Sequence, residues 1–267
     1  GGDFLLLLLG LGVVSGIGIG LGYVCPISLG VQWFPTNKGL VTGIAVAGFG
    51  MGAIVLSWFA ELLLKTLPVL AVFRICGIAL GAVALFSSLL FAKPPENKGV
   101  QAGAGLRVPL KEFITHPRFL LICGGMFSGT FAGLLISGNL VSIMQSMRLS
   151  YAQALGALWC FAVGNTIGRL FWGHVHDRLK SRTTILISLW VLASACSALA
   201  IGNGPVALWS LSVLTGFGFG ACFVVYASSI AEHFGVENLP RLYPICFAGY
   251  GVAALIGAPA GGLIADL

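Results

Sequence analysis

Charged side chains are scarce in this chain. Only 8% of the 267 residues are Asp, Glu, Lys or Arg, whereas 58% are hydrophobic, and the mean hydropathy is +1.01. Soluble domains carry roughly 25% charged residues. A globule of this size would therefore lack the polar surface that keeps it in water. The composition excludes an ordinary soluble domain and indicates a membrane protein.

Sequence patterns that bind metals or phosphates are missing too. The seven Cys residues fall at most one to an apolar run, without any Cys-x-x-Cys. His174 and His176 do not share a helix face, and we expect both to be solvated rather than metal-binding. The Gly-rich runs at 16–22 and 216–220 lack the Lys-Ser/Thr that completes a phosphate loop. We expect no metal, no cofactor and no enzymatic chemistry.

Long apolar runs recur along the whole chain, each about as long as a bilayer-spanning helix requires. The 39 Gly residues suit close helix packing in lipid. We predict an all-α membrane protein with about eight transmembrane helices. Their predicted ranges are 4–31, 39–61, 69–92, 119–145, 152–174, 183–202, 205–231 and 244–264.

The net charge of +6 is explained by the predicted loops rather than by binding to nucleic acid. Lys38, the loop 93–118, the loop 175–182 and Arg241 fall on one side of the membrane and hold most of the Lys and Arg residues. An excess of Lys and Arg marks the cytoplasmic side. We predict a multi-pass protein of a plasma or inner membrane, with both loops cytoplasmic.

The chain repeats itself at an offset of 200 residues. Ser15-Gly16-Ile17-Gly18-Ile19-Gly20 returns as Thr215-Gly216-Phe217-Gly218-Phe219-Gly220, and Ala47-Gly48-Phe49-Gly50 returns as Ala248-Gly249-Tyr250-Gly251. The first two predicted helices thus match the seventh and eighth, so the repeat unit has six helices. A duplication of this size in a membrane chain indicates a transporter built from two pseudo-symmetric bundles.

The repeat also predicts how the chain is divided. Residues 1–92 would be the last three helices of an N-terminal bundle, 93–118 a cytoplasmic linker, and 119–267 the first five helices of a C-terminal bundle. The chain begins with Gly1 and ends at Leu267. We therefore expect a fragment that covers helices four to eleven of a twelve-helix protein.

A charged motif follows the fifth predicted helix. Residues 173–182 read Gly-His-Val-His-Asp-Arg-Leu-Lys-Ser-Arg, which resembles the G-x-x-x-D-R-x-x-x-R loop of the major facilitator superfamily. In that family the loop lies between helices two and three and again between eight and nine, which agrees with the helix count. The resemblance implies a gating role for Gly173, Asp177, Arg178 and Arg182, with Asp177 bound to the start of helix 152–174 or to a nearby cation.

Within that superfamily the chain resembles the oxalate/formate antiporters, relatives of the monocarboxylate transporters. The motifs run from Tyr23-Val24-Cys25-Pro26 to Trp33-Phe34-Pro35-Thr36-Asn37-Lys38-Gly39, and through Asn165-x-x-Gly168-Arg169-x-x-x-Gly173 to His233-Phe234-Gly235 and Tyr243. The resemblance covers essentially all residues. It implies a transported small organic anion, in a protein that we expect to be monomeric.

Arg169 is the one cation well inside a predicted helix. An intramembrane cation usually faces a cavity, and a guanidinium pairs with a carboxylate through two parallel hydrogen bonds. The resemblance implies that this arginine binds the substrate carboxylate. Snorkelling to the cytoplasm, or an ion pair that holds the gate, remains the alternative.

Asn165 lies one turn before Arg169, where proton-coupled monocarboxylate carriers have an aspartate. Asn cannot titrate, which favours anion exchange over proton symport. Oxalate exchangers have a lysine at the position of Tyr250, so this sequence offers one cation where a dicarboxylate would want two. Tyr250 either donates its hydroxyl to an anion or only packs.

Aromatic residues can wall a pathway near this arginine, or form core packing. The candidates are Tyr23, Phe219 and Tyr226. The sequence thus predicts a secondary transporter of mono- or dicarboxylates that works by alternating access. A proton-coupled symporter and a non-transporting, sensor-like paralogue remain the alternatives.

Overall fold

The computed structural model describes residues 4–92, 94 and 109–265, and all regular elements within these ranges are helices. The first four are α1 (Phe4–Leu7), which runs through a π-helix (Leu8–Val14) into α2 (Ser15–Trp33), then α3 (Lys38–Leu64) and α4 (Val69–Leu89). After α5 (Leu110–Ile114) come α6 (Pro117–Ser146), α7 (Tyr151–Ile201) and α8 (Pro205–Gly220). A 3-10 turn (Ala221–Phe223) joins α8 to α9 (Val225–Phe234), and a second (Val236–Asn238) leads into α10 (Leu239–Ala265).

The 51-residue helix α7 folds back on itself. Lys180 interrupts it with φ 65° and ψ 170°, which is not helical. Near the start of α7, the carbonyl of Gln153 accepts a hydrogen bond of 2.9 Å from Trp209 of α8. The end of α7 at Ile201 is followed at once by α8, so both ends of α7 lie at the same end of the molecule. The predicted helices 152–174 and 183–202 are the two arms of this hairpin.

Seven of the described helical stretches are long and apolar enough to cross a membrane. With α7 as two arms, they correspond to the eight predicted spans. The main departures from the predicted ranges lie in the last two spans. The last helix begins at Leu239 rather than 244, and the one predicted for 205–231 breaks into a 3-10 turn at Ala221 and resumes up to Phe234. The prediction followed the apolar runs, whereas helices continue past the apolar core into the polar interface.

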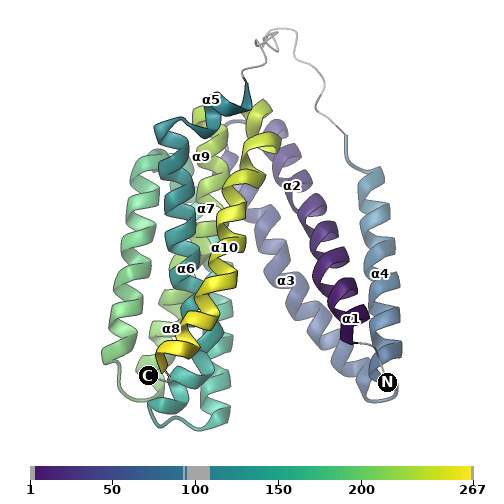
Figure 1. Cartoon of the computed structure of the whole chain (residues 1–267), viewed down its shortest axis with the longest axis vertical. Helices are drawn as coiled ribbons and strands as arrows, with labels where there is room; N and C mark the ends of the chain where they lie inside the picture. The colour runs from purple at the N-terminus through teal and green to yellow at the C-terminus, as the bar shows by residue number, and fades with distance from the viewer. Residues whose placement is uncertain (1–3, 93, 95–108, 266–267) are drawn as a thin grey trace.

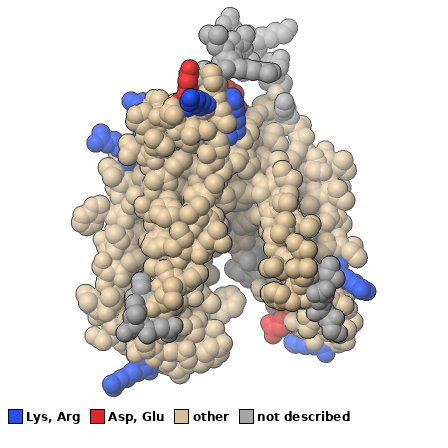
Figure 2. Space-filling model, viewed as in Figure 1, with Lys and Arg blue, Asp and Glu red and all other residues tan. Residues whose placement is uncertain are grey.

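The helices form two groups (Figure 1). One holds α1 to α4, and the other holds α6 to α10. The groups meet near the end where α5 lies and splay apart at the opposite end, where the space-filling view is hollowed between them (Figure 2). Lys and Arg side chains appear toward the two ends of this face, and its middle shows no charged side chain (Figure 2). This distribution is that of a molecule whose middle lies in a bilayer.

The first group ends with α4 at Leu89, and the second begins with α6 at Pro117. Residues 93 and 95–108 of the predicted linker lie outside the described residues. The linker's last part contains the short helix α5, which the sequence did not predict. Phe113 and Ile114 of α5 pack against the hydrophobic core.

Close glycine contacts join the two groups. A Cβ added at Gly43 of α3 would lie 2.6 Å from the carbonyl oxygen of Arg169 in α7, and one at Gly50 would lie 2.7 Å from Thr166 Oγ1. Gly39 and Gly173 face each other so closely that a Cβ on either would overlap the backbone of the other. Small residues are what allows two membrane helices to approach this far. They bring α3 directly against the arm of α7 that contains Arg169.

Candidate functional site

Arg169 lies at the contact between the two helix groups. Its Nε donates to Asn165 Oδ1 at 2.8 Å, and its Nη1 donates to the backbone oxygen of Val46 in α3 at 2.7 Å. Its guanidinium carbon lies 4.6 Å from the ring centroid of Phe223. A guanidinium has five N–H donors, so three remain for another acceptor. The side chain is half-buried and points to this contact, which is not the snorkelling alternative.

Asn165 orients the arginine. It is buried, and its side-chain oxygen accepts the Nε–H bond from the residue one turn later. An amide accepts this bond without adding a negative charge. Among the described residues, no carboxylate lies within ion-pair distance of Arg169. The positive charge of the guanidinium is therefore held in place and left without a counter-ion.

Aromatic rings continue from this arginine across both helix groups. Phe223 contacts Tyr250 at 5.6 Å between ring centroids, and Tyr250 stacks on Phe247 at 5.0 Å. Phe247 in turn stacks on Tyr23 of α2 at 4.9 Å. The chain of ring contacts consists of Phe49, Tyr23, Phe247, Tyr250, Phe223, Phe219 and Phe161. Three predicted site residues, Tyr23, Tyr250 and Phe219, thus belong to one cluster around Arg169.

Tyr226 lies apart from this cluster. A Cβ added at Gly125 of α6 would lie 3.1 Å from its hydroxyl, so the ring fills the space between α9 and α6. Its side chain is only 1% exposed. The sequence left two interpretations open for Tyr226, a wall of the pathway or core packing. The structure supports core packing and does not support the predicted substrate contact.

Tyr243 is a member of the site that the sequence did not single out as a site residue. It is fully buried near the start of α10, and its ring lies 6.3 Å from that of Tyr23. The hydroxyls of both tyrosines are buried, and the two side chains interact with each other. A signal was present, because Tyr243 precedes Tyr250 by two helical turns and so shares its face of α10.

Asp177 connects the two groups at the end near α5. Its carboxylate accepts hydrogen bonds from the backbone N–H groups of Gly39 at 2.7 Å and Leu40 at 2.9 Å, in the first turn of α3. These amides have no partner within the helix, and the helix dipole makes this end positive. Among the described residues, Asp177 makes neither of the two predicted contacts, with the start of helix 152–174 or with a nearby cation. Asp177 binds the start of α3 instead, and α3 belongs to the other group.

The remaining predicted gate residues divide in two. Gly173 lies against Gly39 and sets the distance that Asp177 spans. Arg178 and Arg182 are exposed, and among the described residues neither takes part in a hydrogen bond or ion pair. The structure therefore brings Gly173 and Asp177 to the contact between the groups and leaves the two arginines at the surface.

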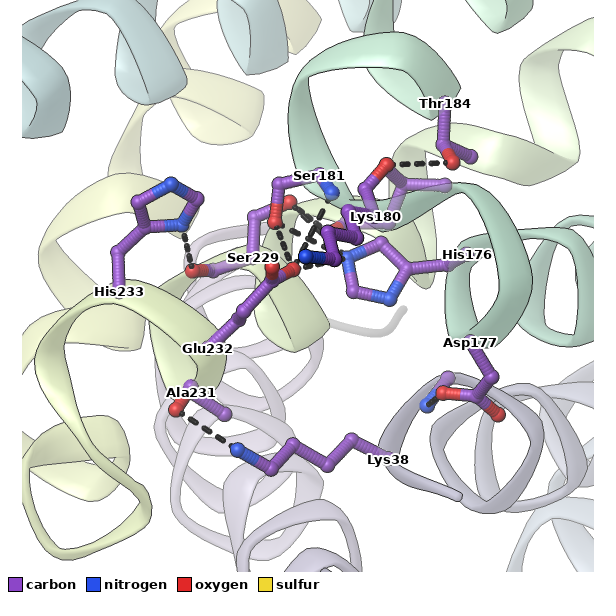
Figure 3. Close-up of polar contacts among 12 residues, drawn as sticks. Lys38, His176, Asp177, Lys180, Ser181, Thr184, Ser229, Ala231, Glu232 and His233 are labelled. Carbon is purple, nitrogen blue, oxygen red and sulfur yellow. Dashed lines mark hydrogen bonds and ion pairs between the residues drawn. The ribbon is translucent and has the colours of Figure 1, made fainter. Parts of the chain in front are cut away.

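A second polar contact crosses between the groups next to Asp177 (Figure 3). Lys38 Nζ, on the first residue of α3, donates to the carbonyl oxygen of Ala231 at 3.2 Å. Ala231 lies in the last turn of α9, where carbonyls lack helical partners and attract cations. The start of α3 thus gives a positive side chain to one helix end and receives a negative one from the α7 hairpin.

Glu232 anchors the turn of that hairpin. Its Oε2 accepts from the Ser181 backbone at 3.1 Å and from the Ser181 hydroxyl, and lies 3.6 Å from His176 Nε2 (Figure 3). His174 is exposed as expected, but His176 is only 4% exposed, so its predicted solvation is wrong. His176 lies in the turn between the two spans. Burial lowers its pKa, although Glu232 and Asp177 oppose the shift.

Among the described residues, no three His, Cys, Asp or Glu side chains converge on a possible metal position. The site consists instead of a fixed cation, hydroxyl donors and aromatic rings. These groups can bind an anion without any covalent step.

Comparison with known proteins agrees with this arrangement. The chain is 27% identical to the uncharacterized MFS-type transporter YhjX of Escherichia coli over 258 residues, 95% of the chain and 64% of that relative. It is 26% identical to the oxalate:formate antiporter of Oxalobacter formigenes over 263 residues, 94% of the chain and 61% of that relative. It is 24% identical to apicoplast pyruvate carrier 1 of Toxoplasma gondii over 313 residues, 92% of the chain and 57% of that relative.

The chain thus spans less than two thirds of the length of each of these relatives. They are transporters rather than enzymes, and the described helices include seven candidate spans of a multi-pass membrane protein. The family model of the Major Facilitator Superfamily matches residues 2–188 and 140–267, which together leave out only the first residue. The chain belongs to the Major Facilitator Superfamily.

Proposed function

We propose that the protein is a secondary transporter that moves small organic anions by alternating access, with Arg169 as the counter-charge for the substrate carboxylate. The observation that carries the proposal is the state of this guanidinium. It lies where the two helix groups meet, keeps three N–H donors free, and has no carboxylate beside it among the described residues. A carboxylate can take two of those donors in parallel.

Exchange is the mode of transport that this charge favours. A half-buried guanidinium without a counter-ion is costly to enclose, and an anion removes that cost. The carrier would therefore change its orientation readily only with an anion bound at Arg169. In the described spans no Asp or Glu lies near Arg169, and Asn165 cannot bind or release a proton at neutral pH. Proton symport would need a titratable group that these residues do not provide.

One cation at the site also favours one carboxylate. The second carboxylate of a dicarboxylate would lose its water without gaining a positive partner, because position 250 holds a tyrosine. We infer that monocarboxylates such as formate, lactate or pyruvate are preferred over oxalate. On this basis Tyr250→Lys should move the preference toward oxalate.

Proteoliposomes that contain the full-length carrier test the proposal. Vesicles loaded with formate, pyruvate or oxalate should take up the same labelled anion by exchange. Arg169→Lys should reduce this uptake by about tenfold or more, because an ammonium keeps the charge but loses the bidentate pairing. Arg148→Lys, at an exposed arginine in the turn before α7, is the matched control and should exchange normally.

Three results would contradict the proposal. Uptake that needs a proton gradient but no internal anion would indicate symport. Oxalate that outcompetes every monocarboxylate in the unmutated carrier would overturn the preference for one carboxylate. Binding of anions without any uptake would indicate a non-transporting, sensor-like protein.

A further inference from the structure

A buried histidine lies at the end near α5 where the two helix groups touch, the closed end. His176, in the turn of the α7 hairpin, is 4% exposed and directly precedes Asp177, which binds the first turn of α3. Its Nε2 lies 3.2 Å from Ser181 Oγ, 3.4 Å from Ser229 Oγ and 3.6 Å from Glu232 Oε2 (Figure 3). The proposed anion site does not include this imidazole, so its place beside the contact needs its own explanation.

The neighbours of His176 Nε2 determine which ring nitrogen carries the proton. The Ser181 hydroxyl donates to Glu232, and the Ser229 hydroxyl donates to the carbonyl oxygen of Val225 at 2.7 Å. Both hydroxyl protons are therefore committed, and a carboxylate can only accept, so Nε2 has to be the donor. In the neutral ring Nδ1 then has only a lone pair. Nδ1 is buried without a hydrogen-bond partner among the described residues, so a second proton there would have no acceptor.

Among the described residues, the other helix group brings positive charge to this imidazole. Lys38 is the first residue of α3, and the helix dipole makes the same end of α3 positive. Burial lowers the pKa of His176, and the charges of His233 in α9 and of Lys38 add to this shift. Glu232 and Asp177 oppose it. The closed end therefore holds this imidazole neutral.

Separation of the groups at the closed end would change these influences in one direction. The ammonium and the positive helix end of α3 would move away from His176. Asp177 would lose the two amides of α3 and keep its charge beside the imidazole. The attraction of Glu232 would stay, because α7 and α9 belong to the same group. A proton is therefore bound more tightly by the conformation that is open at this end than by the closed one.

We propose that His176 is a proton switch for the closed end: a proton bound at Nδ1 favours separation of the two helix groups there. The inference rests on the alternation between two conformations that the proposed function requires, and it adds a regulation that the anion site does not supply. The proton acts on the conformation and is not a transported ion. Acid on the side of the membrane where α5 lies then draws the carrier toward the conformation open to that side.

Spin labels at the exposed positions Thr36 and Arg182 report the distance between the groups at this end, in the full-length carrier with its native cysteines replaced. The distance distribution is recorded without substrate between about pH 7.5 and 5.5, above the ordinary pKa values of carboxyl groups. The ratio of the long to the short component should rise about fivefold to tenfold on acidification, because only the open conformation binds the proton with an ordinary histidine pKa. In His176→Gln, whose amide can still donate to Glu232, this ratio should stay constant.

Three further variants keep this test sharp. His174→Gln removes an exposed imidazole of the same turn, and His233→Gln removes one that faces the cluster from α9. Both should keep the rise. Lys38→Met should enlarge the long component at the higher pH and reduce its rise with acid, since the closed end then lacks the charge that repels the proton. This variant keeps the test decisive if His176→Gln does not fold.

Two results would overturn the inference. A long component that shrinks on acidification would mean that the imidazolium strengthens the closed end. A rise that persists in His176→Gln would mean that another group binds the proton.

The proposed function can fail separately. Two populations whose ratio does not depend on pH would overturn the switch and leave the alternation intact. A single population at every pH, in the unmutated carrier and in Lys38→Met alike, would overturn both, because the alternation on which they depend would be absent.

Discussion

At the scale of single residues, the site depends on what stands next to Arg169. An aspartate one turn earlier would pair with the guanidinium and compete with any anionic substrate. Asn165 instead accepts the Nε–H bond at 2.8 Å and adds no charge. The backbone oxygen of Val46 holds a second N–H from the opposite group of helices. The arginine is therefore oriented by neutral acceptors, and its charge stays available to a ligand.

His176 leads to a prediction about pH. In the folded protein its pKa lies below the ordinary value of 6.5, mainly because it is buried, so the unfolded chain binds the proton more readily. The contribution of His176 to the free energy of unfolding is therefore complete above about pH 6.5. It declines as the pH falls below that value toward the folded pKa. The melting temperature of the purified carrier should therefore fall on acidification below pH 6.5, and His176→Gln should flatten this part of the curve.

His174→Gln provides the control for His176→Gln, because His174 is exposed two residues earlier in the same turn. It should leave the pH curve unchanged. If both variants flatten the curve equally, or if His176→Gln leaves it unaltered, the buried imidazole is not the group responsible.

At the scale of elements, helix ends hold the two groups together. The first turn of α3 receives the Asp177 carboxylate, and its first residue, Lys38, donates to the last turn of α9. Each contact places a charge at the helix end of opposite sign. Both contacts depend on backbone groups that every helix end exposes, so they need few specialised side chains. Glu232 supports them by binding Ser181 in the turn of the α7 hairpin.

Asp177→Asn should slow transport more than it weakens substrate binding. The amide keeps one acceptor but loses the charge, which is worth about 1 kcal/mol at a helix start. The conformation in which the two groups touch at the Asp177 end would then be about fivefold less populated, relative to the conformation that is open at that end. The maximal exchange rate should fall by a similar factor, while the half-saturating substrate concentration should change less than twofold. Initial rates in proteoliposomes measure both quantities.

Glu112→Gln is the matched control for Asp177→Asn, since it removes an exposed carboxylate on α5. Its exchange rate should equal that of the unmutated carrier. Unchanged rates in Asp177→Asn itself would make Asp177 an ordinary residue of the turn.

Much of this arrangement was predictable from local sequence patterns. Apolar runs predicted the spans, and the spacing of Asn165 and Arg169 placed both on one helix face. The partner of Asp177 was not predictable, because Gly39 lies 138 residues away in the chain and its amide carries no side-chain signal. The sequence left two interpretations open for Tyr226, because the 3-10 turn at Ala221–Phe223 turns the following helix by more per residue than an α-helix does. The burial of His176 depends on packing against α9, which a motif cannot reveal.

At the scale of the whole molecule, the two helix groups touch at one end and separate at the other (Figure 1). The contacts through Asp177, Lys38 and the glycines at 39 and 173 all lie at the closed end, which we predict to be cytoplasmic. The hollow at the other end (Figure 2) then opens to the outside. Alternating access requires that this end closes when the cytoplasmic end opens. We propose that the two groups are pseudo-symmetric bundles. Closing of one end and opening of the other would then be parts of one rotation.

Spin labels at the two ends test this coupling in the full-length carrier. One pair joins the exposed positions Thr36 and Arg182 at the closed end, and another joins Thr66 and Asn203 at the open end, in a carrier whose native cysteines are replaced. Combining Lys38→Met with Asp177→Asn removes both helix-end contacts. The distance distribution of the first pair should gain a longer component, and that of the second pair a shorter one of similar population. If both pairs lengthen together, the variant has loosened the fold rather than shifted it between two arrangements, and the two groups do not move as coupled bodies.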